Sequence, residues 1–475
     1  MSRIQTKFDH TLEQSEIIIN LTNTSKDEAG EHYTDNKQEV QQTSIYGIQA
    51  PLIMVNNVVI DFNEIISFEL DCSGILPTVS MEIKERKGLI TSFDTPGIDN
   101  ELRVQVIPKF DDKYKKINLT FYITNMFTSS ESISIMGKYK VPSLTSSQIK
   151  SFGEINTYDL CEIIAKETGL GFASNIESND GNKRWIYCSN KSYLDLLNHE
   201  IKFSSFDYNI FDFWIDPWNN LTLVDIYERY NAKDKEEEMM LWVTGQNKEM
   251  DEGNQPEPME VPAIINNHPN SKTSELYADS YSISNTPSAQ LAKGTDRLYS
   301  IYEMEKYEYM DHLIQDGSTK KDIFVNFEYL GEVYGSYNYL LSNKLREDFL
   351  QKIRSNESIT VSLNYPLLGL LRGNKVDLIW YKNDDNTKNL GEKLDEFGIT
   401  NSTNTKVEDP LINNLQTDGK FKTDNGGFEI DKSISGQYYI NGWVLKFEES
   451  KWQHVLTLSR STLEKPKIID SENEK

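Results

Sequence analysis

The sequence predicts a mixed, β-rich α+β protein of several domains, and three observations support that prediction. Apolar and polar residues alternate in two separate stretches, residues 46–145 and 355–465, which is typical of strands with one buried face. Between them, in residues 146–228, the apolar residues take the spacing of helices. The chain has 475 residues, of which 11% are aromatic, so it is too long for one ordinary core and rich in strand-forming residues.

The first β-rich block is expected at residues 46–145. Turn-forming pairs such as Asn56-Asn57 and Ser73-Gly74 separate its apolar runs. Because no helical segment interrupts these runs, they favour a barrel or a sandwich. The expected strands cover residues 52–60, 65–70, 79–83, 102–107, 119–123 and 133–139.

Residues 146–228 are expected to form a compact α/β domain. One helix is predicted to begin with Thr157 as its N-cap and to stop at Gly169, and Ser192 is predicted to cap a second helix. The residues Asp216–Asn220 carry a strong turn signal between two short apolar runs. Strands are predicted at 185–188, 211–215 and 221–226.

The second β block, residues 355–465, ends in a predicted hairpin. Tyr438, Ile440 and Val444 alternate with polar or small residues, and the polar residues 448–451 form the expected turn. Four further segments carry few regularly spaced apolar residues, apart from a predicted helix at 335–353. They are a flexible N-terminal arm at 1–45, an acidic insertion and helical linker region at 229–354, a long surface loop at 384–426 and a charged tail at 466–475.

The composition disfavours several classes of function. With 74 acidic and 49 basic residues the formal net charge is −25, which repels phosphate backbones and anionic lipid surfaces. The cysteines Cys72, Cys161 and Cys188 lie far apart and lack CxxC spacing, so they are expected to be buried, reduced thiols of a protein made in a cytoplasm. Neither an apolar leader nor a run long enough to span a membrane is expected.

No motif for catalysis, cofactor binding or metal binding emerges, and we therefore predict no catalytic, cofactor-binding or metal-ligating residues, and no enzyme. The six histidines show neither HxH nor HExxH spacing. Residues 369–373 lack the Lys-Ser/Thr pair of a phosphate-binding loop. Acidic pairs such as Asp207 and Asp212 are expected by chance in so acidic a chain, and a solvated face explains them better than glycoside hydrolysis.

A cluster of aromatic residues between positions 206 and 218 allows two interpretations. Alternation along a predicted strand favours a buried core, whereas an exposed member could stack on a sugar ring. The cluster comprises Phe206, Tyr208, Phe211, Phe213, Trp214 and Trp218.

Three segments together resemble the baseplate hub proteins of phage tails. The first is the segment Tyr158–Phe172, which contains the first predicted helix and has the pattern L…IA…TGL-x-F. The second is residues 185–225, where a strand, a helix, FDFWID and NNLTLVDI follow in the order of that family. The third is the closing hairpin, preceded by LRGNKVDLIWY at Leu371–Tyr381. The family includes the late-control D-type proteins of contractile tails and the hub part of type VI secretion spikes.

The resemblance implies a structural role. Each subunit would carry two tail-tube-like β-barrel or sandwich domains, at 46–145 and 355–465. A homotrimer would join the hexameric tail tube protein to the trimeric central spike protein in the virion baseplate, with other baseplate proteins as neighbours. DNA would only pass through its channel, without specific nucleic-acid binding or membrane contact, and the chain would be made in the host bacterial cytoplasm.

One alternative stays open at this point. The chain could instead be a carbohydrate-binding or cell-wall-cleaving tail component. In that case an exposed aromatic residue of the 206–218 cluster, for which Trp218 is the candidate, would contact the saccharide.

Overall fold

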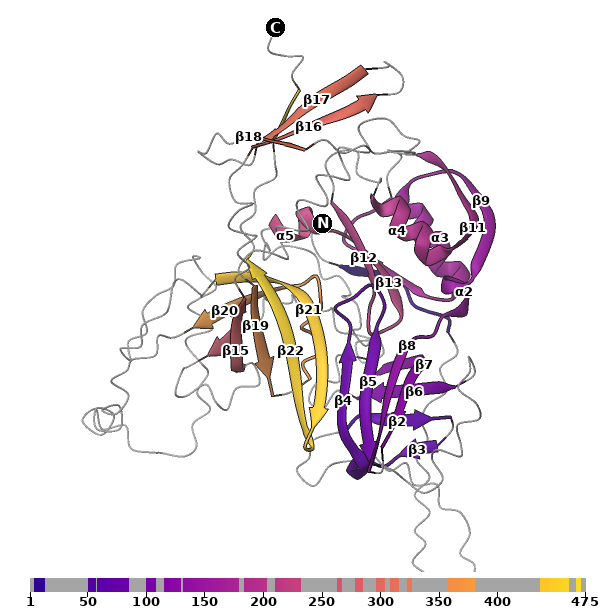
Figure 1. Ribbon diagram of the computed structural model, residues 1–475, viewed down its shortest axis with the longest axis vertical. Coiled ribbons are helices and arrows are strands. Elements are labelled where there is room, and N and C mark those ends of the chain that lie inside the picture. The colour runs from indigo at the N-terminus through magenta and orange to yellow at the C-terminus, as the bar shows by residue number, and fades with distance from the viewer. Residues whose placement is uncertain are drawn as a thin grey trace, which may run out of the picture.

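The computed structural model shows an elongated molecule with a large sheet at one end, an α/β unit in the middle and a small sheet at the other end (Figure 1). The structure describes part of the chain. This part comprises residues 4–12, 50–56, 58–84, 100–107, 115–129, 131–178, 183–202, 210–231, 263–266, 278–284, 296–303, 308–315, 323–326, 358–364, 366–380, 436–460 and 467–470.

The large sheet has 13 strands in the described residues, and both predicted β blocks contribute to it. The first block contributes β2 (Leu52–Val55), β3 (Val58–Ile60), β4 (Ile65–Asp71), β5 (Thr78–Lys84), β6 (Glu101–Val106), β7 (Ile117–Thr128) and β8 (Ser132–Tyr139). The later part of the chain contributes β14 (Ala263–Asn266), β15 (Ala278–Ser284), β19 (Ser358–Leu363), β20 (Lys375–Trp380), β21 (Gly436–Glu448) and β22 (Lys451–Arg460).

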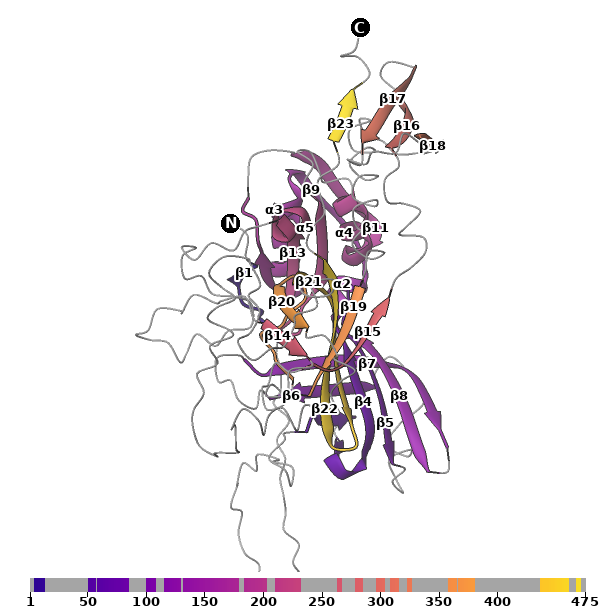
Figure 2. The same ribbon diagram turned by 90° about the vertical axis from the view of Figure 1, so that its left-hand side faces the viewer.

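The two blocks meet where β4 pairs antiparallel with β21, and we call this pairing the seam. The strand order is β15-β19-β22-β21-β4-β5-β8-β7-β6-β2-β3, with β20 also on β21 and β14 on β20. In the seam Val444 lies opposite Asp71 and Glu448 opposite Ser67. The sheet therefore runs without interruption across the predicted boundary between the blocks, and Figure 2 shows it as one curved layer.

The closing hairpin is confirmed, but the residues of its first strand that face the core differ in part from those predicted. Its turn residues Glu449 and Ser450 have φ angles of 50° and 62°, as a tight two-residue hairpin turn requires. A bulge between Ile440 and Gly442 shifts the register, so Trp443 faces the core and Val444 does not. The prediction that Val444 continues the buried alternation of Tyr438 and Ile440 is therefore wrong, because one extra residue reverses the faces of a strand.

The α/β unit contains β9 (Ser147–Ile155), β10 (Gly171–Ser174), β11 (Arg184–Ser192), β12 (Phe211–Ile215) and β13 (Asn220–Asp225). Its helices are α2 (Pro142–Thr145), α3 (Thr157–Thr168), α4 (Tyr193–Lys202) and α5 (Ile226–Asn231). Ser192 caps α4 as predicted, since its hydroxyl accepts from the Asp195 amide at 3.0 Å. Helix α3 stops at Gly169 as predicted, with φ of 77°, but its N-cap is Asn156, one residue before the expected Thr157.

Residues 4–12 differ from the predicted flexible arm. Strand β1 (Gln5–Phe8) pairs with β10 at the edge of the sheet β1-β10-β13-β12. Ile4 is buried, and the rings of Phe8 and Phe172 lie 6.1 Å apart. A four-residue edge strand is too short to show a periodicity, which explains why composition alone suggested an arm. Residues 13–45 of the predicted arm lie outside the described residues.

Two other predicted segments also contain strands. The small sheet has the order β18-β16-β17-β23, formed by β16 (Asp296–Glu303), β17 (Glu308–Gln315), β18 (Ile323–Asn326) and β23 (Lys467–Asp470). The predicted charged tail thus supplies β23, and the predicted acidic insertion supplies strands to two sheets. The predicted helix at 335–353 and the loop at 384–426 lie outside the described residues. Among the helices that are described, none has the length and apolar content to cross a membrane.

Candidate functional site: the junction around Arg372

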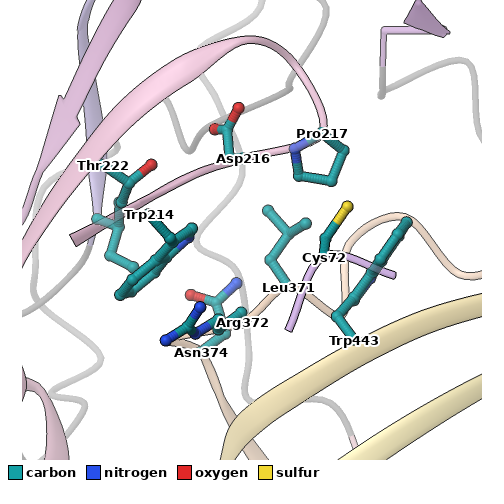
Figure 3. A pocket seen from close by; sticks show the side chains of 10 residues that line it. Cys72, Trp214, Asp216, Pro217, Thr222, Leu371, Arg372, Asn374 and Trp443 are labelled. Carbon is teal, nitrogen blue, oxygen red and sulfur yellow. The ribbon is translucent and has the colours of Figure 1, made fainter. Parts of the chain in front are cut away.

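Arg372 joins three parts of the molecule. It lies between β19 and β20 in the sequence Leu371-Arg-Gly-Asn374, and its guanidinium donates to the carbonyls of Ser73 and Gly74 at 2.8 and 2.7 Å. The same group donates to the Asp212 carboxylate at 3.2 Å and lies 4.4 Å from the centre of a Trp214 ring. One side chain therefore links the second β block to the first block and to the α/β unit, as Figure 3 shows for Arg372 and Trp214.

Gly373 allows the chain to approach this closely. Its φ angle is +88°, and a Cβ atom there would lie 2.6 Å from Cδ1 of Ile4 and 3.2 Å from the Trp214 ring. Its amide donates to the Ile440 carbonyl at 2.9 Å, and its carbonyl accepts from Nε of Arg229 at 2.9 Å. The loop is thus held from both sides, and glycine is needed for both space and backbone conformation.

Strand β12 carries Asp212, the acidic partner of Arg372, and both faces of this strand are buried. Phe213 and Ile215 belong to the large core, whereas Trp214 belongs to a second, smaller core on the other face. Asp212 lies on this second face and is also buried, so its charge needs a partner. The ion pair with Arg372 provides one, which makes the expectation of a solvated face wrong for Asp212. Asp207 lies outside the described residues.

The turn Asp216–Asn220 docks the α/β unit onto the first β block. The Asp216 carboxylate accepts from the amides of Trp218 and Asn220, both at 2.9 Å. Burial raises the pKa of Asp216 to about 6, although these hydrogen bonds oppose the shift. Beyond the turn, Nε1 of Trp218 donates to the Lys115 carbonyl at 2.8 Å, and the Tyr139 hydroxyl donates to the Asn219 side chain at 2.5 Å. The predicted turn is confirmed, and it also serves as a contact surface.

A small cavity lies between these groups. Asp216, Thr222 and Asn374 provide polar atoms at its wall, and Cys72, Leu371 and Trp443 line it as well (Figure 3). Its volume of about 20 Å³ admits a single water molecule. Organic ligands occupy cavities of roughly 300–1,000 Å³. The arrangement is therefore suited to holding three parts of the fold together rather than to binding a substrate.

The other residues named from sequence take core positions. Phe211, Phe213, Trp214 and Trp218 are all buried, which confirms the core interpretation for these four members of the aromatic cluster. Phe206 and Tyr208 lie outside the described residues. Cys72, Cys161 and Cys188 are buried free thiols, as predicted, and burial raises the pKa of Cys72 well above its usual range. No group of three or more metal-ligating side chains occurs in the described part of the chain.

Arg372 was not identified as important from sequence. Two signals were available: a single arginine within the apolar and glycine-containing loop at 367–374, and an aspartate inside the otherwise apolar strand FDFWI. Each alone is weak, because nothing in the sequence states that these segments, 160 positions apart, lie together.

Neither a family model nor a curated protein matches the sequence. Solved structures do. The 43 kDa tail protein of prophage MuSo2 from Shewanella oneidensis has 8% sequence identity and a TM-score of 0.51, over 86% of this chain and 98% of that chain. The tail protein from Neisseria meningitidis MC58 has 10% identity and a TM-score of 0.48, over 86% and 96%.

A type VI secretion system component, the E. coli c3393 protein, has 10% identity and a TM-score of 0.41, over 85% of this chain and 76% of that chain. The Neisseria and E. coli matches fall below a TM-score of 0.5, so the comparison of folds depends on the Shewanella protein. Its low identity limits the conclusion to the fold. At that level the resemblance to phage tail proteins is confirmed: this chain has the fold of a phage tail protein.

Proposed function

We propose that the chain is a non-enzymatic, structural baseplate hub of a bacteriophage tail. In this proposal three copies form an adaptor between the hexameric tail tube and the trimeric central spike, around a channel for DNA. The shared fold with a phage tail protein supports a structural role in a tail. The single observation that carries the adaptor role is the seam, at which two β blocks of one chain continue as one sheet.

Hydrogen bonds and aromatic contacts at the seam fix the position of the two β blocks relative to each other. The Cys72 amide donates to the Trp443 carbonyl at 2.9 Å, and the Trp443 amide donates to the Ser73 hydroxyl at 2.9 Å. On the core side Trp452 contacts both Phe68 and Phe447, with ring centres 6.3 and 5.2 Å apart. Three subunits with two β blocks each present six similar surfaces, which would match a hexameric tube to a trimeric spike.

The sheet also has edge strands to which strands of another chain could be added. In the described residues β3 and β15 end the strand order, so each has one side without a neighbouring strand. Unpaired strand edges readily pair with another chain. We propose that neighbouring subunits or the tube protein cover these edges. The net charge of −25 fits a channel wall that DNA passes without binding.

The alternative of a carbohydrate-binding or cell-wall-cleaving component gains no support from the aromatic cluster. Trp218, its candidate contact residue, is buried and donates its indole hydrogen to Lys115. A Trp218→Ala variant would therefore report on packing between the α/β unit and the first β block.

Electron microscopy of the purified full chain, alone and with the tail tube and spike proteins of the same phage, tests the proposal. We expect three-fold particles with a central channel that bind the tube protein on one face and the spike protein on the other. Particles that stay monomeric in the presence of both proteins would overturn it.

A further inference from the structure

Strands β9 and β11 form an antiparallel pair with one covered and one uncovered face. Ile186 and Cys188 of β11 are buried against the helices of the α/β unit. On the opposite face Ile149, Trp185 and Tyr187 are 85%, 75% and 69% exposed. Such large apolar side chains rarely gather on a surface that stays in water. We call these three residues the β9–β11 patch.

A second apolar patch lies on the hairpin of β7 and β8. Phe127 and Met136 are 62% and 44% exposed. Met136 lies opposite Asn125 and Phe127 lies opposite Ser134, so both side chains project from the same face of the hairpin. We call these two residues the β7–β8 patch. In the described part of the chain, the two patches contain all the exposed large apolar residues.

The two patches belong to different parts of the molecule. The β9–β11 pair lies in the α/β unit, and β7 and β8 lie in the large sheet below it (Figures 1 and 2). One copy leaves both patches exposed, so within a single chain neither covers the other. Two copies can bury both when the β7–β8 patch of one contacts the β9–β11 patch of the next. Such a contact between unlike surfaces closes into a ring when the rotation between copies allows it.

Exposed charges flank the patches in a complementary order. Glu154 lies opposite Trp185 in the β9–β11 register, and Lys138 follows Met136 by two positions on β8. Both charged residues are exposed.

When the two patches are in contact, Lys138 of one copy can pair with Glu154 of the next. The apolar residues of both patches then lie beside this ion pair. This is the usual arrangement of an interface, with an apolar centre and a charged rim that selects the orientation.

We infer that the β9–β11 patch binds the β7–β8 patch of a second copy of this chain. This inference rests on the proposed function, since it names the contact through which copies of the hub associate, and it deepens that proposal by giving the contact a direction around the ring. Aromatic anchors such as Trp185 and Tyr187 are typical of the residues that contribute most to association.

Paired cysteines test the contact in the full-length chain. The double variant Lys138→Cys, Glu154→Cys is treated with a short bismaleimide, and products are separated by denaturing electrophoresis. We expect a ladder of linked chains, because each copy offers one thiol to the copy before it and one to the copy after. The single variants are the matched controls and should give no product beyond dimers at background level. The native cysteines are buried and should not react.

Sedimentation of the wild-type chain separates failure of the contact from failure of the trimer. Trimers without cross-linking would overturn this contact and leave the proposed adaptor intact. Cross-linked chains that extend beyond three would support the contact and overturn the trimer. A wild-type chain that stays monomeric in the presence of the tube and spike proteins, and whose double variant gives no cross-linked product there, would overturn both. The charge reversal Glu154→Lys should weaken association at least tenfold, and Lys138→Glu in the same chain should restore it; failure of that rescue would also count against the pairing.

Discussion

Strands β12 and β9 belong to the same α/β unit but meet opposite environments. Every residue of β12 is buried, and its one acidic side chain, Asp212, is paired with Arg372. On β9 one face stays open to solvent, and its apolar residue Ile149 is 85% exposed. The comparison shows two ways in which an unfavourable environment is compensated. A charged side chain buried in a core is stabilised by an ion pair within the chain, whereas an apolar side chain exposed on the surface is stabilised by contact with another molecule.

The largest effect is expected from Arg372→Met. The variant leaves the Asp212 carboxylate buried without its cation and removes the donor to Ser73 and Gly74. Loss of one partner of a buried ion pair costs about 3–5 kcal/mol in the free energy of unfolding. Chemical denaturation followed by tryptophan fluorescence measures this loss. Lys166→Met, which breaks the exposed pair with Glu162, is the control and should cost less than about 0.5 kcal/mol. Equal costs for both variants would contradict the role given to the junction.

The next largest loss of stability is expected from Gly373→Ala, for which Gly153→Ala is the control because both glycines have positive φ angles. At Gly373, φ of +88°, alanine would place Cβ 2.6 Å from Ile4, whereas at Gly153 on β9, φ of +79°, no atom of the described residues lies within 4 Å of that position. Gly373→Ala should therefore cost about 1–3 kcal/mol for overpacking in addition to the backbone cost of about 1–2 kcal/mol that Gly153→Ala shares. Melting curves of the two variants give the difference directly. If Gly153→Ala were as destabilising as Gly373→Ala, the close packing at the junction would not be the cause.

A pH-dependent effect is expected from His454, a buried polar residue without the kind of partner that Asp212 has. Within the described part of the chain neither ring nitrogen of His454 has a hydrogen-bond partner, and the ring packs edge-on against Trp443. Burial lowers the pKa of His454 from 6.5 to about 3. The folded state then binds fewer protons than the unfolded state between these values, so stability falls as the pH drops below 6.5.

The variant His454→Phe should remove that part of the acid sensitivity. Between pH 6.5 and 5 the contribution of one such group is about 1–2 kcal/mol. Unfolding curves at both pH values, for the wild type and the variant, isolate it. Asp216 acts in the opposite direction, because its raised pKa of about 6 favours the folded state as the pH falls from 6 toward 3.8. The comparison must therefore be made within the pair of proteins that differ only at position 454.

The smallest effect on folding is expected from Trp185→Ser and Tyr187→Ser. Both side chains are exposed, so the free energy of unfolding of the separated chain should change by no more than about 0.5 kcal/mol. Association between copies should fall sharply in the same variants if the β9–β11 patch is an interface. Denaturation in dilute solution and sedimentation at high concentration provide the two readings. A large loss of stability in dilute solution would show that these residues support the fold instead.

Local features of the fold were predictable from sequence. The helix caps at Ser192 and Gly169, the turns at Asn56 and Asp216, and the strands around residues 65–70, 79–83 and 211–215 follow from spacing and turn chemistry over a few residues. Strand β9 was missed because its sequence, SQIKSFGEI, is mostly polar on both faces. Strand β1 was missed because it is short and lies within a polar segment.

What the sequence by itself determined is the β-rich class, the helical segments of the α/β unit, the closing hairpin and the absence of a recognisable catalytic motif. These depend on residue types within one or two turns or strands of one another. Only the tertiary structure decided that β4 pairs with β21, that Arg372 meets Asp212, and that Ile149, Trp185 and Tyr187 remain uncovered. The reason is physical: strand pairing and burial depend on partners hundreds of positions away, and the alternation within one strand specifies which face is apolar without specifying what that face will meet.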